Sequence, residues 1–230
     1  MSNDQRTFAI IGTGRMGGAI GGRLSAMGHG VIYGSRTPDA GATRELVEKV
    51  GHGAQAASPA TAASKADVIV IAVPWAGAEE AVSSLGDLSG KLVIDVTNAL
   101  SFAPSSGLME MASDTSAGEE IQGWLPGSKV VKAFNTVGFH VIASPDAAGG
   151  TVSVPLVGDD AEAKILVAEM VQSMGFETID VGPLKHARAL EMMSMLYIVP
   201  YLQDRKEDAF EYYLRKGAAP KESKGVRAAG

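Results

Sequence analysis

Residues 8–36 read FAIIGTGRMGGAIGGRLSAMGHGVIYGSR, and this stretch decides the fold. It begins with an unbroken apolar run, residues 8–11, as expected for a strand that is buried on both faces. A glycine-rich turn follows, and then apolar residues at helical steps, namely Ile20, Leu24 and Met27. A second β-branched run, residues 31–33, completes the order strand, turn, helix and strand. This order predicts a dinucleotide-binding α/β unit.

The turn itself, Gly12-Thr13-Gly14-Arg15-Met16-Gly17, matches the pattern G-x-G-x-x-G, and we predict that all of it contributes to a phosphate site. Gly12 allows the tight turn, Gly14 lets the backbone approach a pyrophosphate, and Gly17 lets the helix pack closely on the strand. Backbone amides at the start of the helix then face the phosphates. The alternative is a glycine-rich turn without a ligand. The buried strand before the turn and the amphipathic helix after it disfavour that alternative.

The choice of dinucleotide is predicted at the end of the second strand, where NAD enzymes place an acidic residue that binds the ribose 2′-hydroxyl. Here the strand ends in Gly34-Ser35-Arg36-Thr37, and no carboxylate follows until Asp39. The Arg36 guanidinium can instead bind a 2′-phosphate bidentately, with the Ser35 and Thr37 hydroxyls as further donors. NADPH is therefore the expected cofactor, although Arg36 as a solvated surface residue is the alternative.

Short β-branched runs recur along the rest of the chain with helical or turn-rich segments between them, a pattern typical of a parallel sheet with crossover helices. The sequence predicts an α/β protein with a doubly wound Rossmann fold, a mainly parallel sheet and a small helical C-terminal extension. The expected strands are residues 8–11, 31–33, 54–57, 68–73, 92–96, 130–134, 152–157 and 178–181. The expected helices are residues 16–27, 38–50, a short one after Trp75, 118–125, 161–174 and 184–199, and one marked by Phe210, Tyr213 and Leu214.

The chain is expected to have three parts. They are an NADP-binding Rossmann domain over residues 1–182, a helical extension over residues 183–217 and a disordered tail over residues 218–230. Residues 99–128 form the expected lid or substrate-facing segment. The helix at 184–199 is rich in methionine, which indicates core or dimer packing, so we expect a homodimer.

Polar and aromatic residues follow three strands of the predicted sheet. Val73-Pro74-Trp75 ends the fourth strand, in the crevice where open α/β sheets bind ligands. Trp75 is placed either to wall a nicotinamide or to pack at the loop. Asn98 and Asn135 end the next two strands, where each can hydrogen-bond a ribose or a carboxamide.

Composition narrows the classes of function. The 230 residues carry a formal net charge of −6, which argues against the broad basic surface that nucleic acids require. The chain has no cysteine, which excludes disulfides, thiolate metal sites and thiol nucleophiles. It has neither a signal-peptide layout nor an apolar stretch long enough to span a bilayer. A cytoplasmic protein without a metal, a membrane or a nucleic-acid partner is expected.

At this point the residues resemble a known family, the NADPH-dependent F420 reductases, together with the cytoplasmic domain of the STEAP metalloreductases. The resemblance reaches nearly to Leu196. The segments that carry it are Ile11-Gly12-Thr13-Gly14, Gly34-Ser35-Arg36, Val73-Pro74-Trp75, Val131-Lys132-Ala133-Phe134-Asn135-Thr136, Val157-Gly158-Asp159-Asp160 and Asp180-Val181-Gly182-Pro183-Leu184. Residues 95–98 and 132–135 look closer to STEAP-like and bacterial members than to archaeal ones.

The resemblance implies hydride transfer between NADP(H) and a flavin-like small-molecule acceptor. The acceptor is coenzyme F420 in one branch of the family, and in the other it is a flavin such as FMN or FAD that passes electrons onward. On the matching positions the resemblance assigns the 2′-phosphate to Ser35 and Arg36. It assigns the surroundings of the nicotinamide to Pro74, Trp75, Asn98, Ala133 and Asn135.

No catalytic side chain is expected, because hydride transfer between two bound rings needs mainly proximity and orientation. Among the histidines only His140 is placed for chemistry, and a structural role for it is favoured. Lys132 and Lys185 have no assigned role. Two alternatives stay open: reduction of a small imine or carbonyl, as in pyrroline-carboxylate reductases and β-hydroxyacid dehydrogenases, and a non-catalytic NADPH-binding sensor. Only about 50 residues follow Val181, which disfavours the first because those enzymes carry a longer helical C-terminal domain.

Overall fold

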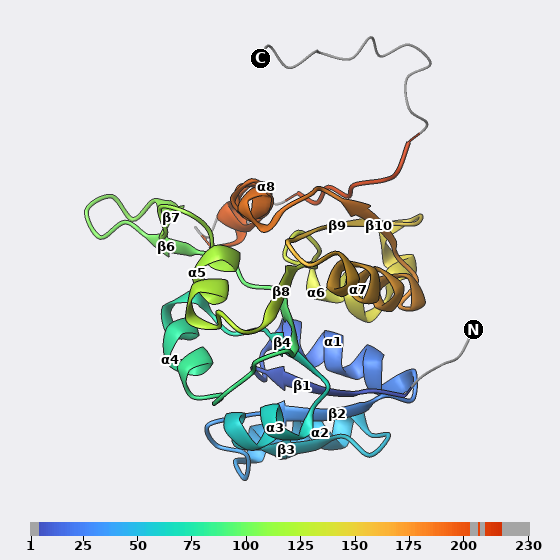
Figure 1. Ribbon diagram of the computed structural model, residues 1–230. Coiled ribbons are helices and arrows are strands. Elements are labelled where there is room, and N and C mark those ends of the chain that lie inside the picture. Colours follow the sequence, from blue (N-terminus) through green and yellow to red (C-terminus); the bar gives the residue numbers. More distant parts are fainter. Residues whose placement is uncertain (1–4, 203–206, 208–209, 218–230) are drawn as a thin grey trace.

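The computed structural model describes residues 5–202, 207 and 210–217. Its centre is an eight-stranded sheet in the order β10-β9-β8-β5-β4-β1-β2-β3, with helices on both faces (Figure 1). The doubly wound α/β Rossmann fold predicted from the sequence is therefore confirmed. The strands are β1 (Thr7–Ile11), β2 (Gly30–Gly34), β3 (Gln55–Ala57), β4 (Val68–Ile71), β5 (Leu92–Asp95), β8 (Lys129–Lys132), β9 (Ser153–Gly158) and β10 (Glu177–Asp180).

Neighbouring strands of this sheet are parallel except for the pair β8 and β9. The first strand, β1, pairs with β2 on one side and with β4 on the other, so the strand order reverses at β1. The carboxyl ends of β1, β2, β4, β5 and β8 consequently meet at one edge of the sheet. In open α/β sheets, ligands bind outside this edge at such a reversal.

Helices cover the two faces of the sheet. They are α1 (Arg15–Ala26), α2 (Gly41–Val50), α3 (Pro59–Lys65), α4 (Ala78–Ser83), α5 (Ala117–Trp124), α6 (Phe139–Ala143), α7 (Ala161–Ser173) and α8 (Ala187–Leu202), with short 3-10 turns at Trp75–Gly77, Pro145–Ala148 and Leu184–His186. In β1, Phe8 and Ile10 pack into one apolar cluster, and Ala9 and Ile11 pack into the other. The first cluster includes side chains of α1, α6 and α7, and the second includes side chains of α3, α4, α5 and α8.

Four strands end earlier than predicted: the strand expected at 178–181 ends at Asp180, and three others end where the chain turns at the site edge. The strand expected at 68–73 ends at Ile71, and the strand expected at 92–96 ends at Asp95, whose carboxylate accepts the Thr97 amide in a turn. The strand expected at 130–134 ends at Lys132, because Phe134 has a left-handed backbone with φ of 63°. The helix expected from residue 38 begins only at Gly41, after a turn in which the Ala40 amide donates to the Thr37 carbonyl.

The helix expected around Phe210 and Leu214 was wrong. Residues 210–217 form no helix, and this segment lies beside β9: the Ser153 amide donates to Leu214 O, and the Lys216 amide donates to Ser153 Oγ. The reason is an unfilled side of β9, since β8 pairs with it only at Val157 and Gly158. The expected tail, residues 218–230, lies outside the described residues, and the division at residue 182 stays a prediction.

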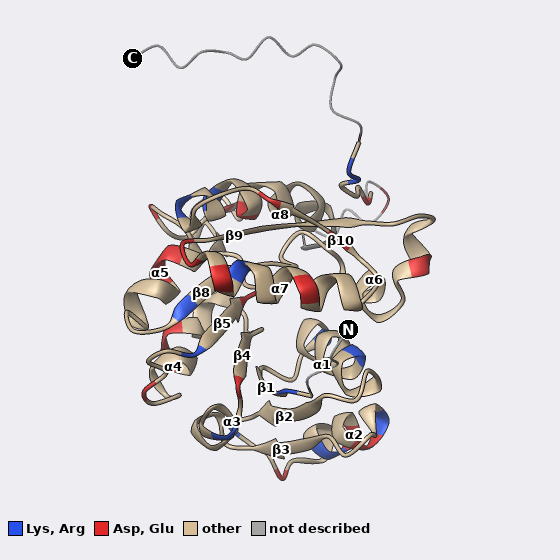
Figure 2. Cartoon of the chain, turned by 45° about the vertical axis from the view of Figure 1, so that its right-hand side comes forward, with Lys and Arg blue, Asp and Glu red and all other residues tan. Residues whose placement is uncertain are grey.

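The expected lid contains structure that the sequence did not predict. A small antiparallel hairpin, β6 (Leu100–Phe102) and β7 (Met109–Met111), extends from the body of the molecule and contacts α8 (Figure 1). Figure 2 shows acidic and basic residues interspersed over the visible helices. Within the described part of the chain, no helix is long and apolar enough to span a membrane.

Candidate functional site

The glycine-rich turn, residues 12–17, lies between β1 and α1 at the carboxyl edge of the sheet. Gly12 has φ of +120°, and a Cβ atom there would lie 2.3 Å from the Ala72 carbonyl oxygen. A Cβ atom at Gly17 would lie 2.1 Å from the Gly12 carbonyl oxygen. Both positions therefore require glycine for packing of the chain itself. Gly14 differs, because nothing lies within 4 Å of its ideal Cβ position, so the chain leaves open space where a ligand can approach its backbone.

The start of α1 is also open. Gly14 is its N-cap residue, no side chain caps the helix, and its first turn holds no acidic residue. Ser116 caps α5 and Asp160 caps α7, whereas α2, α4 and α6 have no side-chain cap, like α1. An uncapped helix start presents amide hydrogens together with the positive end of the helix dipole, which is the arrangement that binds phosphate. The three other residues of the predicted turn differ in surroundings: Thr13 is exposed, the Arg15 guanidinium lies 5.4 Å from the Phe139 ring centroid, and Met16 packs against the core.

The predicted 2′-phosphate residues follow β2. Ser35 is buried, and its Oγ accepts the Thr37 amide at 3.1 Å and lies 3.4 Å from Thr43 Oγ1. These contacts shape the turn that presents the next side chain. Arg36 is exposed, and it has no hydrogen bond or ion pair with any residue that the structure describes. A guanidinium without an internal partner, held beside the open glycine turn, is free to meet an anion.

Trp75 has a packing partner that the sequence did not reveal. Its ring stacks on Trp124 of α5, with centroids 5.5 Å apart and planes inclined by 19°. Pro74 is exposed, and Val73 is partly buried against the second apolar cluster. This geometry favours the packing interpretation of Trp75, although its place at the carboxyl edge still puts the stacked pair beside the predicted nicotinamide region.

Asn98 and Asn135 lie side by side, as expected for residues that end neighbouring strands. Asn135 Nδ2 donates to Asn98 Oδ1 at 2.9 Å, and the Ser194 hydroxyl of α8 lies 2.6 Å from the same oxygen. Asn135 is 2% exposed, and its Oδ1 is buried without a hydrogen-bond partner in the part of the chain that the structure describes. Buried polar atoms are nearly always paired, so this oxygen is a candidate acceptor for a hydrogen bond from a ligand. Ala133, also predicted here, is fully buried and donates its amide to Asp95 O.

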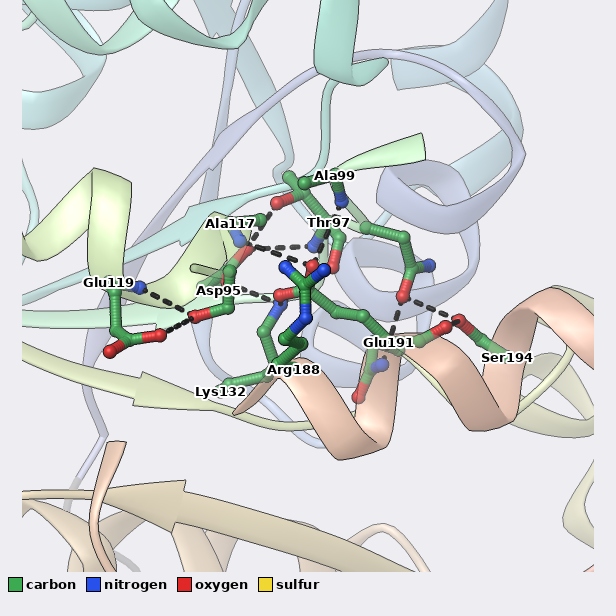
Figure 3. Close-up of polar contacts among 12 residues, drawn as sticks. Asp95, Thr97, Ala99, Ala117, Glu119, Lys132, Arg188, Glu191 and Ser194 are labelled. Carbon is green, nitrogen blue, oxygen red and sulfur yellow. Dashed lines mark hydrogen bonds and ion pairs between the residues drawn. The ribbon is translucent and has the colours of Figure 1, made fainter. Parts of the chain in front are cut away.

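Behind the two asparagines lies a fully buried cluster of charged side chains. Lys132 of β8, Asp95 of β5 and Glu191 of α8 point toward one another (Figure 3). Lys132 Nζ lies 2.5 Å from Asp95 Oδ2 and 3.0 Å from Glu191 Oε1, and it donates to the Thr97 carbonyl at 2.7 Å. Burial opposes the charge of the Lys132 ammonium, but the two facing carboxylates outweigh burial and raise the pKa of Lys132 above its ordinary value.

The remaining carboxylate oxygens of this cluster hold backbone amides. Asp95 Oδ1 accepts the Thr97 amide at 2.8 Å and the Thr97 hydroxyl at 2.7 Å. Glu191 Oε2 accepts the amides of Ala99 and of Ala117, the first residue of α5, both at 3.1 Å. Sequence reasoning left Lys132 without a role and did not single out Asp95 or Glu191. The available signal was a charged residue inside an apolar strand or helix, since such residues are buried only when paired.

The other residues considered for proton transfer have different surroundings. His140 of α6 pairs with Glu211, with Nε2 and Oε1 2.6 Å apart. Lys185 is exposed in the 3-10 turn before α8. Lys132 is buried, so its ammonium is not open to a ligand. Groups of three or more potential metal ligands are also absent among the described residues.

Comparison with known proteins points in one direction. The family model for NADP oxidoreductase, coenzyme F420-dependent, matches residues 7–99. A crystal structure from Arthrobacter sp. FB24, assigned to the F420-dependent NADP reductases, is 30% identical with a TM-score of 0.81, and the match covers 92% of this chain and 100% of that chain.

Two relatives come from different domains of life. The F420-dependent NADP reductase of Methanothermobacter marburgensis is 27% identical over 215 residues, which are 88% of this chain and 95% of the relative. Metalloreductase STEAP3 of Rattus norvegicus is 28% identical over 222 residues, which are 90% of this chain. The matched part is only 43% of STEAP3, so the similarity concerns one portion of that protein.

Proposed function

This chain belongs to the family of F420-dependent NADP oxidoreductases, and on that basis we propose that it transfers a hydride between NADP(H) and a flavin-like acceptor such as coenzyme F420, FMN or FAD. The observation that carries the proposal is the arrangement at one sheet edge. An uncapped helix start beside an open Gly14, an Arg36 without a partner among the described residues and the buried acceptor of Asn135 all lie where the strands end.

Each of these features fits one part of NADPH. The amides at the start of α1 suit the pyrophosphate, and the Arg36 guanidinium, with the Ser35 turn beneath it, suits the 2′-phosphate. When bound, NADPH supplies the hydride. The protein contributes by binding and orienting the two rings and by excluding water from the space between them.

Asn98 and Asn135 suit the carboxamide of the nicotinamide. The two amide groups pair through one N–H and one oxygen, and either orientation of the pair leaves an acceptor on one residue and a donor on the other. A primary carboxamide offers the complementary donor and acceptor. Filling the buried, unpartnered Oδ1 of Asn135 would remove the desolvation cost of that atom, about 1–3 kcal/mol.

The burial of Lys132 favours transfer between rings over reduction of an imine or carbonyl with this lysine as the proton donor. Reduction of those substrates benefits from a positioned proton donor. Lys132 is sealed among carboxylates, and His140 is paired with Glu211. Lys132 is therefore not placed to donate a proton to a substrate beside Asn98 and Asn135.

We further propose a homodimer formed through α8 and the β6–β7 hairpin. Four large apolar side chains on these elements and the loop within the hairpin are exposed: Phe102, Leu108, Met192 and Leu196. The hairpin extends beside α8 (Figure 1), so the four can contribute to one apolar surface. Leu196→Glu should then shift the mass measured by light scattering toward the monomer, whereas Ile165→Glu, an equally exposed position on α7, should leave the mass unchanged.

The proposed activity is tested by mixing the protein with NADPH and a panel of acceptors and following NADPH oxidation. The panel holds F420, FMN, FAD, quinones, and a cyclic imine as the competing substrate class. We expect turnover with a deazaflavin or flavin and none with the imine. Tight NADPH binding without turnover on any acceptor would favour a sensor, and turnover on the imine alone would overturn the proposal.

A further inference from the structure

We propose that Glu191 and Ser194 of helix α8 are positioning residues, which hold Asn98 where it meets the nicotinamide. Helix α8 is then part of the cofactor site. The inference rests on the proposed role of Asn98 and Asn135. It adds that the geometry of this pair is set from α8, far along the chain from the glycine-rich turn.

The first step concerns the segment that carries Asn98. After β5 the chain leaves the sheet, and the backbone on each side of Asn98 is bound by buried charged side chains. Thr97 donates its amide to Asp95 and accepts from Lys132, and Ala99 donates its amide to Glu191. Asn98 is thus clamped on both sides by one cluster whose three charged side chains are all 0% exposed.

The second step concerns the side chain of Asn98. Its Oδ1 accepts from Asn135 Nδ2, and the Ser194 hydroxyl lies on the same oxygen at 2.6 Å. Ser194 lies one helical turn after Glu191 on α8, and its hydroxyl is also 2.8 Å from the Glu191 carbonyl. One helix face therefore touches both the backbone beside Asn98 and the Asn98 amide group.

The third step concerns Glu191 itself. A buried carboxylate is costly unless every oxygen is paired. Here Oε1 meets the Lys132 ammonium, and Oε2 meets two amides that start separate segments, the loop after Asn98 and helix α5. The Glu191 carboxylate on α8 thereby contacts β8, α5 and the loop that carries Asn98. A helix that served only to cover the sheet would need none of these contacts.

The experiment compares two ligands. NADPH reaches the whole site, whereas adenosine 2′,5′-bisphosphate carries the 2′-phosphate and adenosine but no nicotinamide. In Ser194→Ala we expect the Kd for NADPH to rise roughly 3- to 10-fold, because one buried hydrogen bond to the Asn98 amide is lost. The Kd for the bisphosphate should stay within about 2-fold. The kcat for NADPH oxidation should fall with the affinity for NADPH, because the nicotinamide is less well oriented.

Glu191→Gln should give the same pattern with a larger loss. The substitution replaces one carboxylate oxygen by an NH₂ group, which would face either the Lys132 ammonium or the two backbone amides and leave those donors without an acceptor. Ser173→Ala is the matched control. Ser173 of α7 makes the same hydroxyl contact to the carbonyl three residues earlier, Met170 O at 2.6 Å, but lies exposed and far from the site. This variant should leave both Kd values unchanged.

Asn98→Ala separates failure of this inference from failure of the proposed function. If Asn98→Ala weakens NADPH binding and spares the bisphosphate while Ser194→Ala and Glu191→Gln change neither, the positioning role is overturned and the proposed function stands. If Asn98→Ala itself leaves NADPH binding unchanged, the nicotinamide assignment falls and the positioning role falls with it. Equal losses for both ligands in Ser194→Ala would indicate general damage to the fold and also overturn the inference.

Discussion

Arg36 is the residue on which the preference for NADPH over NADH should depend. It is exposed, is presented by the Ser35 turn, and has no internal partner among the described residues. Arg36→Ala should raise the Kd for NADPH roughly 10- to 100-fold, because charge-assisted hydrogen bonds to a phosphate contribute about 1.5–3 kcal/mol. The Kd for NADH, measured by the same fluorescence titration, should change by less than about 2-fold.

Lys49→Ala serves as the control for Arg36→Ala, since it removes an exposed positive charge near the end of α2. Lys49→Ala should change neither the Kd for NADPH nor the Kd for NADH. Equal losses of NADPH and NADH affinity in Arg36→Ala would contradict the assignment of the 2′-phosphate to this side chain.

The buried Tyr33 of β2 should make the stability of the protein depend on pH. Its side chain is fully buried, and burial raises the pKa of the Tyr33 phenol well above its ordinary value. In the folded chain the phenol keeps its proton at a pH where the unfolded chain has lost it. The free energy of unfolding should therefore fall as the pH rises past about 10, by up to about 1.4 kcal/mol per pH unit for this one group.

Tyr33→Phe should remove the part of this decrease in the free energy of unfolding that the phenol causes. The raised pKa of Lys132 acts in the same direction, so a residual slope should persist in the variant. Urea unfolding at several pH values from neutral to alkaline measures both slopes. Identical slopes in wild type and Tyr33→Phe would show that the phenol ionises equally in the folded and unfolded states.

At the scale of elements, α1 is held against the sheet by small residues. A Cβ atom at Gly21 would lie 2.3 Å from Tyr33 Oη and 2.7 Å from its ring, whereas a Cβ atom at Gly22 would meet nothing closer than Val50 Cγ2 at 3.9 Å. Alanine normally stabilises a helix interior relative to glycine by about 0.5–1 kcal/mol. Gly22→Ala should show this gain, and Gly21→Ala should instead destabilise by about 1–3 kcal/mol.

Thermal or urea unfolding of the two variants provides the measurement, and the neighbouring positions serve as controls for each other. Combining Gly21→Ala with Tyr33→Phe should recover part of the loss, since the nearest clashing atom is removed. A stabilised Gly21→Ala protein would mean that α1 can move away from β2 at little cost.

The elements also show how far the sequence could predict the structure. Unbroken apolar runs such as residues 8–11 predicted the central strands, because only a sheet covered on both faces buries them completely. The β6–β7 hairpin was not predicted, since each of its strands has only three residues, and an alternation this short, Leu-Ser-Phe or Met-Glu-Met, does not distinguish a strand from a loop. Phe210, Tyr213 and Leu214 have helical spacing, yet their segment lies beside β9. The reason is that β8 pairs with only the end of β9, which leaves the start of β9 open on that side.

The residues of the candidate site were also predicted only in part. Residues next to a strand end, such as Asn98 and Asn135, were identified because topology alone brings such positions together. The partners of Lys132 were not identified, because Glu191 lies on a helix whose docking depends on packing across the whole sheet. A buried ion pair between distant segments has no local signature beyond the charge itself.

At the scale of the whole molecule, the prediction of a Rossmann domain that ends at residue 182 can be tested against the packing of α8. Leu190 is buried in the second apolar cluster, and Glu191 completes the ion cluster with Lys132 and Asp95. Losing a buried leucine costs about 2–5 kcal/mol, and removing one partner of a buried ion pair costs about 3–5 kcal/mol. These losses are comparable with the total stability of an ordinary domain, about 5–15 kcal/mol.

A chain that ends at His186 should therefore not unfold cooperatively on its own. In calorimetry we expect a broad or missing transition for residues 1–186 and a sharp one for the full chain, with Glu191→Gln in between because it keeps the leucine and the helix. If residues 1–186 melt as sharply as the full chain and still bind adenosine 2′,5′-bisphosphate, the Rossmann part is an independent domain and α8 is an accessory to it. If they do not, the buried charges at the strand ends require α8, and the cofactor site and the C-terminal helix form one folding unit.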